Sequence, residues 1–155
     1  ARAPRALLTV PGGRAWGADL SPDGRWLAYH SNESGGDEVY VRPFPDVQAG
    51  RTLVSTQGGS RPAWARSGRE LFYLDAAGML TSVRVDALNG ALRVGAPTIV
   101  LRRAYFAGST VLGLDLRGYD VAPDGSRFLM IKDSEAGPVA TAAVDVVVGW
   151  ADRLR

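Results

Sequence analysis

Apolar residues occur in short runs along the chain, and turn residues separate one run from the next. Three runs of four residues are apolar throughout, which predicts strands that are covered on both faces. Residues 38–42 instead alternate between polar and apolar side chains, as a half-buried strand does. This pattern predicts an all-β chain of short antiparallel strands. The continuous runs are 26–29, 71–74 and 128–131, and the further predicted elements are strands at 38–42, 79–85, 91–94, 98–101 and 143–148 and one helical turn at 149–155.

Each continuous run follows a tight turn that occurs three times. In the first copy the turn reads Ser-Pro-Asp-Gly, where proline restricts φ and Gly24 accepts the positive φ that starts the return strand. The second copy lacks the Pro-Asp pair but keeps Gly68, so we expect its hairpin to persist. Gly24, Gly68 and Gly125 are 44 and 57 residues apart, which matches one four-stranded propeller blade and one blade with an insertion. The aligned repeats are 18–29, 62–73 and 119–130.

A second element also repeats, at residues 5–13 and 51–59. Each copy predicts a short strand that ends in Gly-Gly just upstream of a turn repeat, as the outer strand of one blade would before the chain crosses into the next. The whole chain, 1–155, is therefore expected to form a single propeller fragment. Its predicted blade portions are about 1–16, 17–59, 60–101 and 118–155, with an insertion at about 102–117.

The block Ser-Pro-Asp-Gly-Arg-x-Leu-Ala-Tyr at 21–29 resembles the PD40 repeat of TolB-like six-bladed β-propellers. Residues 39–45, 58–64, 69–73, 119–129 and 146–150 resemble the C-terminal propellers of bacterial protein-kinase-like proteins. The resemblance implies an all-β partial propeller of about three four-stranded antiparallel blades. The chain contains no glycine-rich ATP loop, His-Arg-Asp or Asp-Phe-Gly motif, so we expect no kinase activity on it.

Composition narrows the possible functions. The chain has no cysteine, which excludes disulfides, thiolate chemistry and cysteine-ligated metals. Its net charge is only +2, and its arginines are scattered among acidic residues, so we expect no nucleic-acid binding. No apolar stretch is long enough for membrane insertion. Both a periplasmic or extracytoplasmic location and a cytoplasmic location are compatible with this sequence.

Three blades form only half of a six-bladed ring, which leaves the apolar faces of the two terminal blades without a neighbour. We therefore expect a homodimer in which a two-fold axis closes the ring. The alternatives are a monomeric fragment with polar end faces and a swapped dimer of another shape.

His30 is the only histidine and a candidate for a general base. Ser21, Ser31 and Ser60 are nearby candidate nucleophiles, but none lies in a Gly-x-Ser-x-Gly elbow. We therefore interpret His30 as a hydrogen-bonding residue of the surface or a loop.

Asp19 and Asp120 occupy the same repeat position, on strands predicted to be innermost and near the central channel. A closed dimer would bring four such carboxylates towards one axis, where Ca²⁺ or another divalent cation could bind. They are thus candidates for metal ligands and for catalysis, by analogy with calcium-dependent propeller lactonases and phosphotriesterases. Because no ligand-spaced motif accompanies them, the preferred interpretation is that they bond the backbone of the blades or face solvent. No other cofactor is predicted.

Three functional hypotheses follow. The leading one is a non-catalytic propeller module for protein–protein or ligand recognition, which would be the sensor or scaffold part of a larger bacterial protein. The second is a metal-dependent hydrolase, lactonase- or phosphotriesterase-like, with carboxylates at the channel. The third is a purely structural fragment that assembles with itself.

Overall fold

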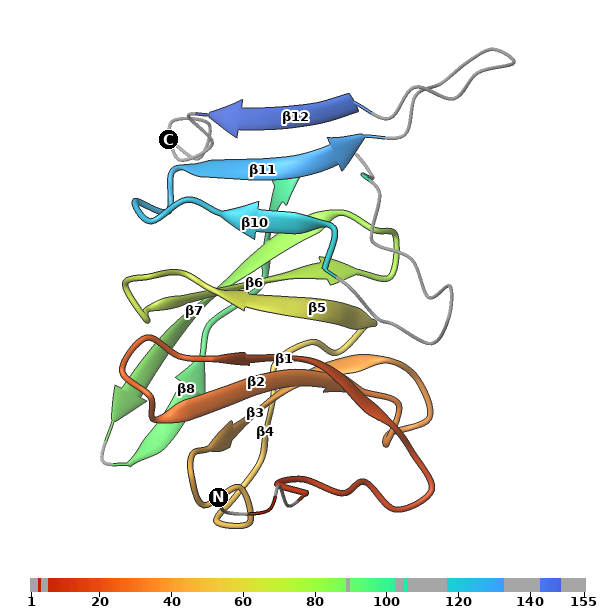
Figure 1. The fold of residues 1–155 in the computed structure, drawn as a ribbon, viewed down its shortest axis with the longest axis vertical. Helices are drawn as coiled ribbons and strands as arrows, with labels where there is room; N and C mark the ends of the chain where they lie inside the picture. Colours follow the sequence, from red (N-terminus) through yellow and green to blue (C-terminus); the bar gives the residue numbers. More distant parts are fainter. Residues whose placement is uncertain are drawn as a thin grey trace.

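The computed structural model describes residue 3 and residues 6–88, 90–102, 105, 117–132 and 143–148. This part of the chain forms twelve strands and no helix. The strands make three sheets that lie side by side in chain order, as Figure 1 shows. All strand pairs are antiparallel. The helical turn predicted at 149–155 and most of the predicted insertion at 102–117 lie outside the described residues.

In each of the first two sheets, the strands follow one another in chain order from an inner strand to an outer strand. The first runs β1-β2-β3-β4, and the second runs β5-β6-β7-β8, with β9 pairing along the first part of β7. One edge of the long β7 pairs with β6, and the other edge pairs with β9 near the start of β7 and with β8 near its end. The bounds are β1 Ala15–Leu20, β2 Trp26–Ser31, β3 Glu38–Pro43, β4 Thr52–Leu53, β5 Gly59–Trp64, β6 Glu70–Asp75, β7 Leu80–Leu88, β8 Ala91–Val94 and β9 Thr98–Leu101.

The third sheet has three described strands, in the order β10-β11-β12. The predicted strands at 38–42, 79–85, 91–94, 98–101 and 143–148 are confirmed, whereas the strand expected within 5–13 is not, since residues 6–10 form none. A short outer strand forms only beside a partner: Thr52 and Leu53 pair with β3, and no described strand precedes β1. The bounds are β10 Tyr119–Val121, β11 Arg127–Lys132 and β12 Ala143–Val148.

The three repeated turns have nearly the same backbone geometry. Gly24, Gly68 and Gly125 have φ values of 70°, 69° and 70°. In each turn the glycine N–H donates to the carbonyl three residues earlier, over 2.8, 2.9 and 2.8 Å. The second hairpin thus persists without the Pro-Asp pair, as predicted, because the positive φ at Gly68 is what the turn requires.

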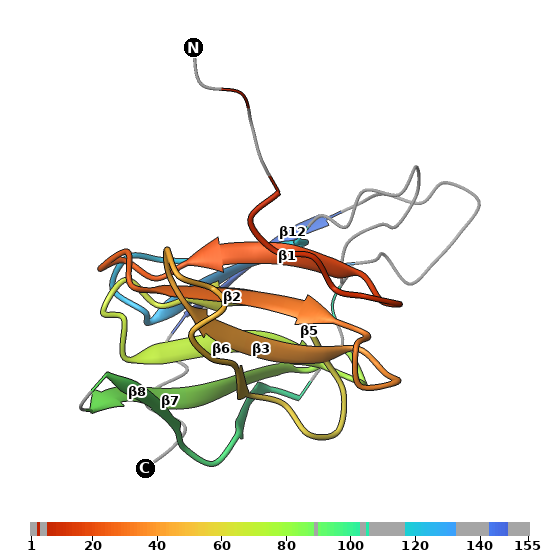
Figure 2. The same cartoon turned by 90° about the horizontal axis from the view of Figure 1, so that it is seen from below.

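Two layers of buried side chains hold the sheets together. The layer between the first and second sheets includes Trp26, Val41 and Leu71. The layer between the second and third sheets centres on Phe72 and Phe128, whose rings meet edge to face with centroids 4.9 Å apart. Each sheet therefore buries a face against the next one, and Figure 2 shows β1, β2 and β3 of the first sheet next to one another in that order. Successive sheets packed face to face in this way form a partial propeller.

Candidate functional site

The inner edges of the three sheets meet around Arg117, just before β10. Its Nη1 lies 3.6 Å from Asp19 Oδ2, and its Nη2 lies 3.6 Å from Asp120 Oδ1. The same guanidinium donates from Nε to the carbonyl of Tyr119 (3.0 Å) and from Nη1 to the carbonyl of Pro62 (3.1 Å). One side chain therefore links β1, β5 and β10.

Two further hydrogen bonds complete this inner-edge network. The hydroxyl of Tyr119 donates to the carbonyl of Arg61 over 2.7 Å, and the Trp64 N–H donates to Asp19 Oδ2 over 2.8 Å. Burial raises the pKa of the Tyr119 hydroxyl, so it stays protonated and able to donate. The guanidinium of Arg117 also lies 5.6 Å from the centre of the Tyr119 ring. Asp19 thus bonds the backbone of the neighbouring sheet.

The structure brings Asp19 and Asp120 to one place, but on either side of a guanidinium. A fixed positive charge between two carboxylates competes with a metal cation for them. Asp120 is also largely exposed, and its Oδ1 accepts the N–H of Val121 over 2.9 Å. Among the described residues, no group of three or more histidine, cysteine, aspartate or glutamate side chains could hold a metal ion.

His30 is placed differently from the interpretation as a surface or loop residue. It lies within β2, is almost fully buried, and stacks on Trp16 with ring centroids 5.5 Å apart. Its Nδ1 accepts the N–H of Arg61 over 3.2 Å, which leaves the proton of the neutral ring on Nε2. His30 therefore connects the first sheet to the second.

A bulge at the same repeat position shapes the inner strands of the first two sheets. The pairing register shifts between Trp16 and Asp19 in the first sheet and between Ser60 and Ala63 in the second. Each bulge contains a residue with positive φ, Gly17 at 57° in the first and Arg61 at 53° in the second. The bulge in the second sheet turns the Arg61 N–H towards His30 and the Arg61 carbonyl towards the Tyr119 hydroxyl.

The outward faces of the terminal sheets expose leucines at positions that are buried elsewhere in the repeat. Leu129 is 46% exposed, whereas Phe72 and Ala28 at the same repeat position are fully buried. Leu20 is 44% exposed, whereas the equivalent Trp64 is buried against the first sheet. The difference arises because the inner positions have a neighbouring sheet, whereas the terminal ones have none among the described residues.

Charged side chains cover a tyrosine pair on the outward face of the first sheet. The rings of Tyr29 and Tyr40 stack with centroids 5.6 Å apart. Arg42 donates from Nε to the Tyr29 hydroxyl over 2.8 Å, and the Arg51 guanidinium lies 5.0 Å from the Tyr40 ring centre while pairing with Glu33. This face therefore presents arginine side chains beside its exposed leucines.

Sequence reasoning missed the residue at the centre of the inner-edge network. Arg117 falls at the end of the predicted insertion, outside every repeat, and its only signal is its position two residues before Tyr119.

No helix among the described residues is long and apolar enough to cross a membrane.

These features define the chain as part of a β-propeller, with three successive blades joined at their inner edges. Comparison with solved structures shows that the fold is that of TolB-like propellers. A structure assigned as TolB from Agrobacterium tumefaciens matches with a TM-score of 0.59 and 13% identity, over 88% of this chain and 46% of that one. TolB from Acinetobacter baumannii matches with a TM-score of 0.50 and 14% identity, over 86% of this chain and 30% of that one. The chain thus spans less than half of either structure, and no family model or curated protein matches it.

Proposed function

We propose that this chain is a non-catalytic propeller module that recognises a protein or small-molecule ligand. The observation that carries the proposal is the inner-edge network, in which Arg117 engages both Asp19 and Asp120. Of the two carboxylates that a hydrolase would need at the channel, Asp19 instead accepts the Trp64 N–H of the neighbouring sheet, and Asp120 pairs with the same guanidinium. His30, the other candidate for catalysis, is occupied at Nδ1 by a backbone N–H.

A metal-removal experiment tests this proposal against the hydrolase alternative. Melting temperature and hydrolysis of lactone and phosphotriester substrates are measured with excess EDTA and with added Ca²⁺. We expect no EDTA-sensitive turnover and no rise in melting temperature with Ca²⁺, since a ligand that binds the folded state would raise it. Turnover that EDTA abolishes, and that Asp120→Asn also abolishes, would show instead that the chain is a metal-dependent hydrolase.

We further propose that a second copy of the chain completes the ring. The supporting observation is the exposure of Leu129 on the outward face of the third sheet and of Leu20 and Leu53 on the outward face of the first. A two-fold axis would make this contact twice and cover both faces.

Sedimentation velocity at micromolar concentration tests the dimer. We expect a dimer for the unmodified chain and a monomer for Leu129→Asp, which places a charge in the proposed contact. Leu88→Asp is the matched control, because Leu88 is 51% exposed but lies at the tip of the β7–β8 hairpin. A monomeric unmodified chain, or a Leu129→Asp variant that still dimerises, would refute the second copy as the occupant.

The role as sensor or scaffold of a larger bacterial protein is part of the same proposal. It is supported by the resemblance of residues 39–45 and 58–64 to propellers of bacterial protein-kinase-like proteins.

A further inference from the structure

The third sheet differs from the first at its outer edge. In the first sheet, β4 pairs with the edge of β3 that faces away from β2. β12 is the counterpart of β3, because β3 pairs with β2 and β12 pairs with the equivalent strand β11. Among the described residues, no strand pairs with the other edge of β12. Its backbone N–H and C=O groups on that edge are therefore a template for one more strand.

The sequence that forms the outer strand of the first sheet occurs a second time, before β1. Residues 5–13 repeat residues 51–59, the segment that contains β4. In both copies the segment leads into the innermost strand of a sheet, β1 in one case and β5 in the other. The residues that correspond are Leu7 with Leu53, Leu8 with Val54 and Thr9 with Ser55. The second copy therefore indicates how the first would lie beside a partner strand.

Hydrogen bonds and burial hold the second copy against β3. The N–H of Val54 donates to the carbonyl of Val39 over 2.8 Å, and the side chain of Val54 lies in the core layer between the first two sheets. The hydroxyl of Ser55 accepts the N–H of Val39, also over 2.8 Å. In the first copy, by contrast, Leu8 is only half-buried and Thr9 is exposed. Residues 6–10 thus have the sequence of an outer strand but no strand to pair with among the described residues.

Residues 6–10 lie far from β12 of their own chain. Figure 1 shows the N-terminal segment beside the first sheet, at one end of the molecule, and β12 at the other end. The second sheet lies between them, since one core layer joins the first sheet to the second and the other joins the second to the third. Pairing with β12 therefore requires the segment of another copy.

The connection from the segment to the inner strand is long enough for this pairing. Ala63 follows Leu53 by ten residues, whereas Asp19, which has the same repeat position as Ala63, follows Leu7 by twelve. Ten residues suffice to carry the chain from the outer strand of the first sheet to the inner strand of the second. Twelve can therefore span the equivalent step, from the third sheet of one copy to the first sheet of the next.

We propose that residues 6–10 of a second copy add to β12 as the outer strand of the third sheet, and that the two copies of the ring-closing dimer exchange this strand reciprocally. By the register of β3 with β4, Leu7 lies opposite Asp145, and the N–H of Leu8 donates to the carbonyl of Val144. Leu8 is then covered between the two copies, as Val54 is covered between two sheets. This inference rests on the proposed dimer and names the segment that joins its halves.

Disulfide crosslinking tests the register, and it is specific because the chain has no cysteine of its own. Hydrogen-bonded and non-hydrogen-bonded pairs alternate in an antiparallel ladder, so Leu7 and Asp145 form a non-hydrogen-bonded pair. The Cα atoms of such a pair are about 4.5 Å apart, which a disulfide can span. We therefore expect Leu7→Cys/Asp145→Cys to give a covalent dimer on oxidation, seen by non-reducing electrophoresis. Leu7→Cys/Val144→Cys is the matched control, since successive residues of a strand face opposite sides of the sheet.

Proline at position 8 tests the backbone hydrogen bond. Leu8→Pro and Leu8→Ala both remove the leucine side chain, but only proline also removes the N–H. Residues 6–10 form no strand within the chain, so both variants should keep the circular dichroism spectrum of the unmodified chain. Each dimer loses two hydrogen bonds in Leu8→Pro, so its dissociation constant, measured by sedimentation velocity over a concentration series, should be about tenfold or more above that of Leu8→Ala.

The outcomes separate the exchanged strand from the dimer itself. A covalent dimer for the 7/145 pair and not for the 7/144 pair would support the exchange. An unmodified chain that sediments as a dimer, combined with no covalent dimer for the 7/145 pair or with equal dissociation constants for Leu8→Pro and Leu8→Ala, would overturn the exchange and leave the dimer in place. A disulfide within one chain at 7/145 would also overturn it, and a monomeric unmodified chain would refute both proposals.

Discussion

Replacing Arg117 by methionine tests whether the inner-edge network holds the blades together. Methionine keeps most of the aliphatic stem and removes the guanidinium. The loss comprises two hydrogen bonds to carbonyls at 3.0 and 3.1 Å, an ion pair with the half-buried Asp19, and the contact with the Tyr119 ring. The hydrogen bonds contribute about 1 kcal/mol each, and the ion pair and ring contact about 0.5 kcal/mol each. The pair with the exposed Asp120 adds little.

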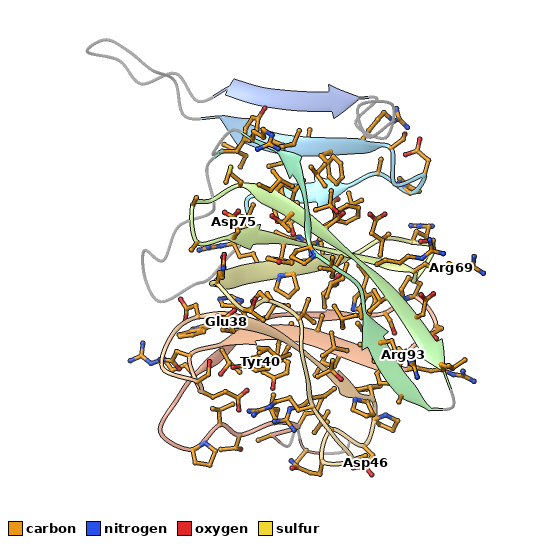
Figure 3. The ribbon with its side chains drawn as sticks, turned by 180° about the vertical axis from the view of Figure 1, so that it is seen from behind. Glu38, Tyr40, Asp46, Arg69, Asp75 and Arg93 are labelled. Carbon is orange, nitrogen blue, oxygen red and sulfur yellow. The ribbon has the colours of Figure 1, made fainter. Side chains whose placement is uncertain are left out.

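The free energy of unfolding should therefore fall by about 2–3 kcal/mol, which corresponds to roughly 5–10 °C in melting temperature for a domain of this size. Urea unfolding followed by tryptophan fluorescence and circular dichroism measures the change, at one fixed protein concentration because association would add to stability. Arg93→Met is the control, since Arg93, labelled in Figure 3, is an exposed residue of β8. A loss for Arg117→Met no larger than that for the control would refute the reasoning.

Two further substitutions test the second sheet and the first bulge. Burial raises the pKa of Glu70 above its ordinary value of 4.5, against the opposing effects of the Ser82 hydroxyl and the Arg84 charge. The folded state therefore binds this proton more tightly than the unfolded state, so ionisation costs stability above the folded pKa and the cost disappears as the pH falls below about 4.5. Glu70→Gln should raise the melting temperature at pH 7 and match the unmodified chain at about pH 4; a lower melting temperature at pH 7 would contradict this. Gly17→Ala should destabilise the fold by about 1–2 kcal/mol, because φ is 57° there and a Cβ would lie 3.0 Å from His30 Nδ1. Gly36→Ala, where a Cβ meets nothing within 4 Å, should be neutral in the same urea assay, and an equal loss in both variants would show that the bulge does not need glycine.

Local patterns in the sequence determined the hairpins. The spacing of Gly24, Gly68 and Gly125 predicted three repeats, and their shared φ near 70° is why the turn persists where Pro-Asp is missing. Uninterrupted apolar runs predicted strands covered on both faces, because such a strand is stable only between two packed layers. These signals lie within about ten residues of chain, so turn chemistry and side-chain alternation suffice to read them.

Tertiary structure decided what the candidate residues do. Asp19 and Asp120 were correctly placed on inner strands, but only the packing of three sheets brings Arg117 between them. Likewise, the hydroxyl of Thr81 is buried without a hydrogen-bond partner among the described residues, and its own strand pattern gives no sign of this. Contacts between blades join residues tens of positions apart, and no local periodicity records which polar group will lie opposite which.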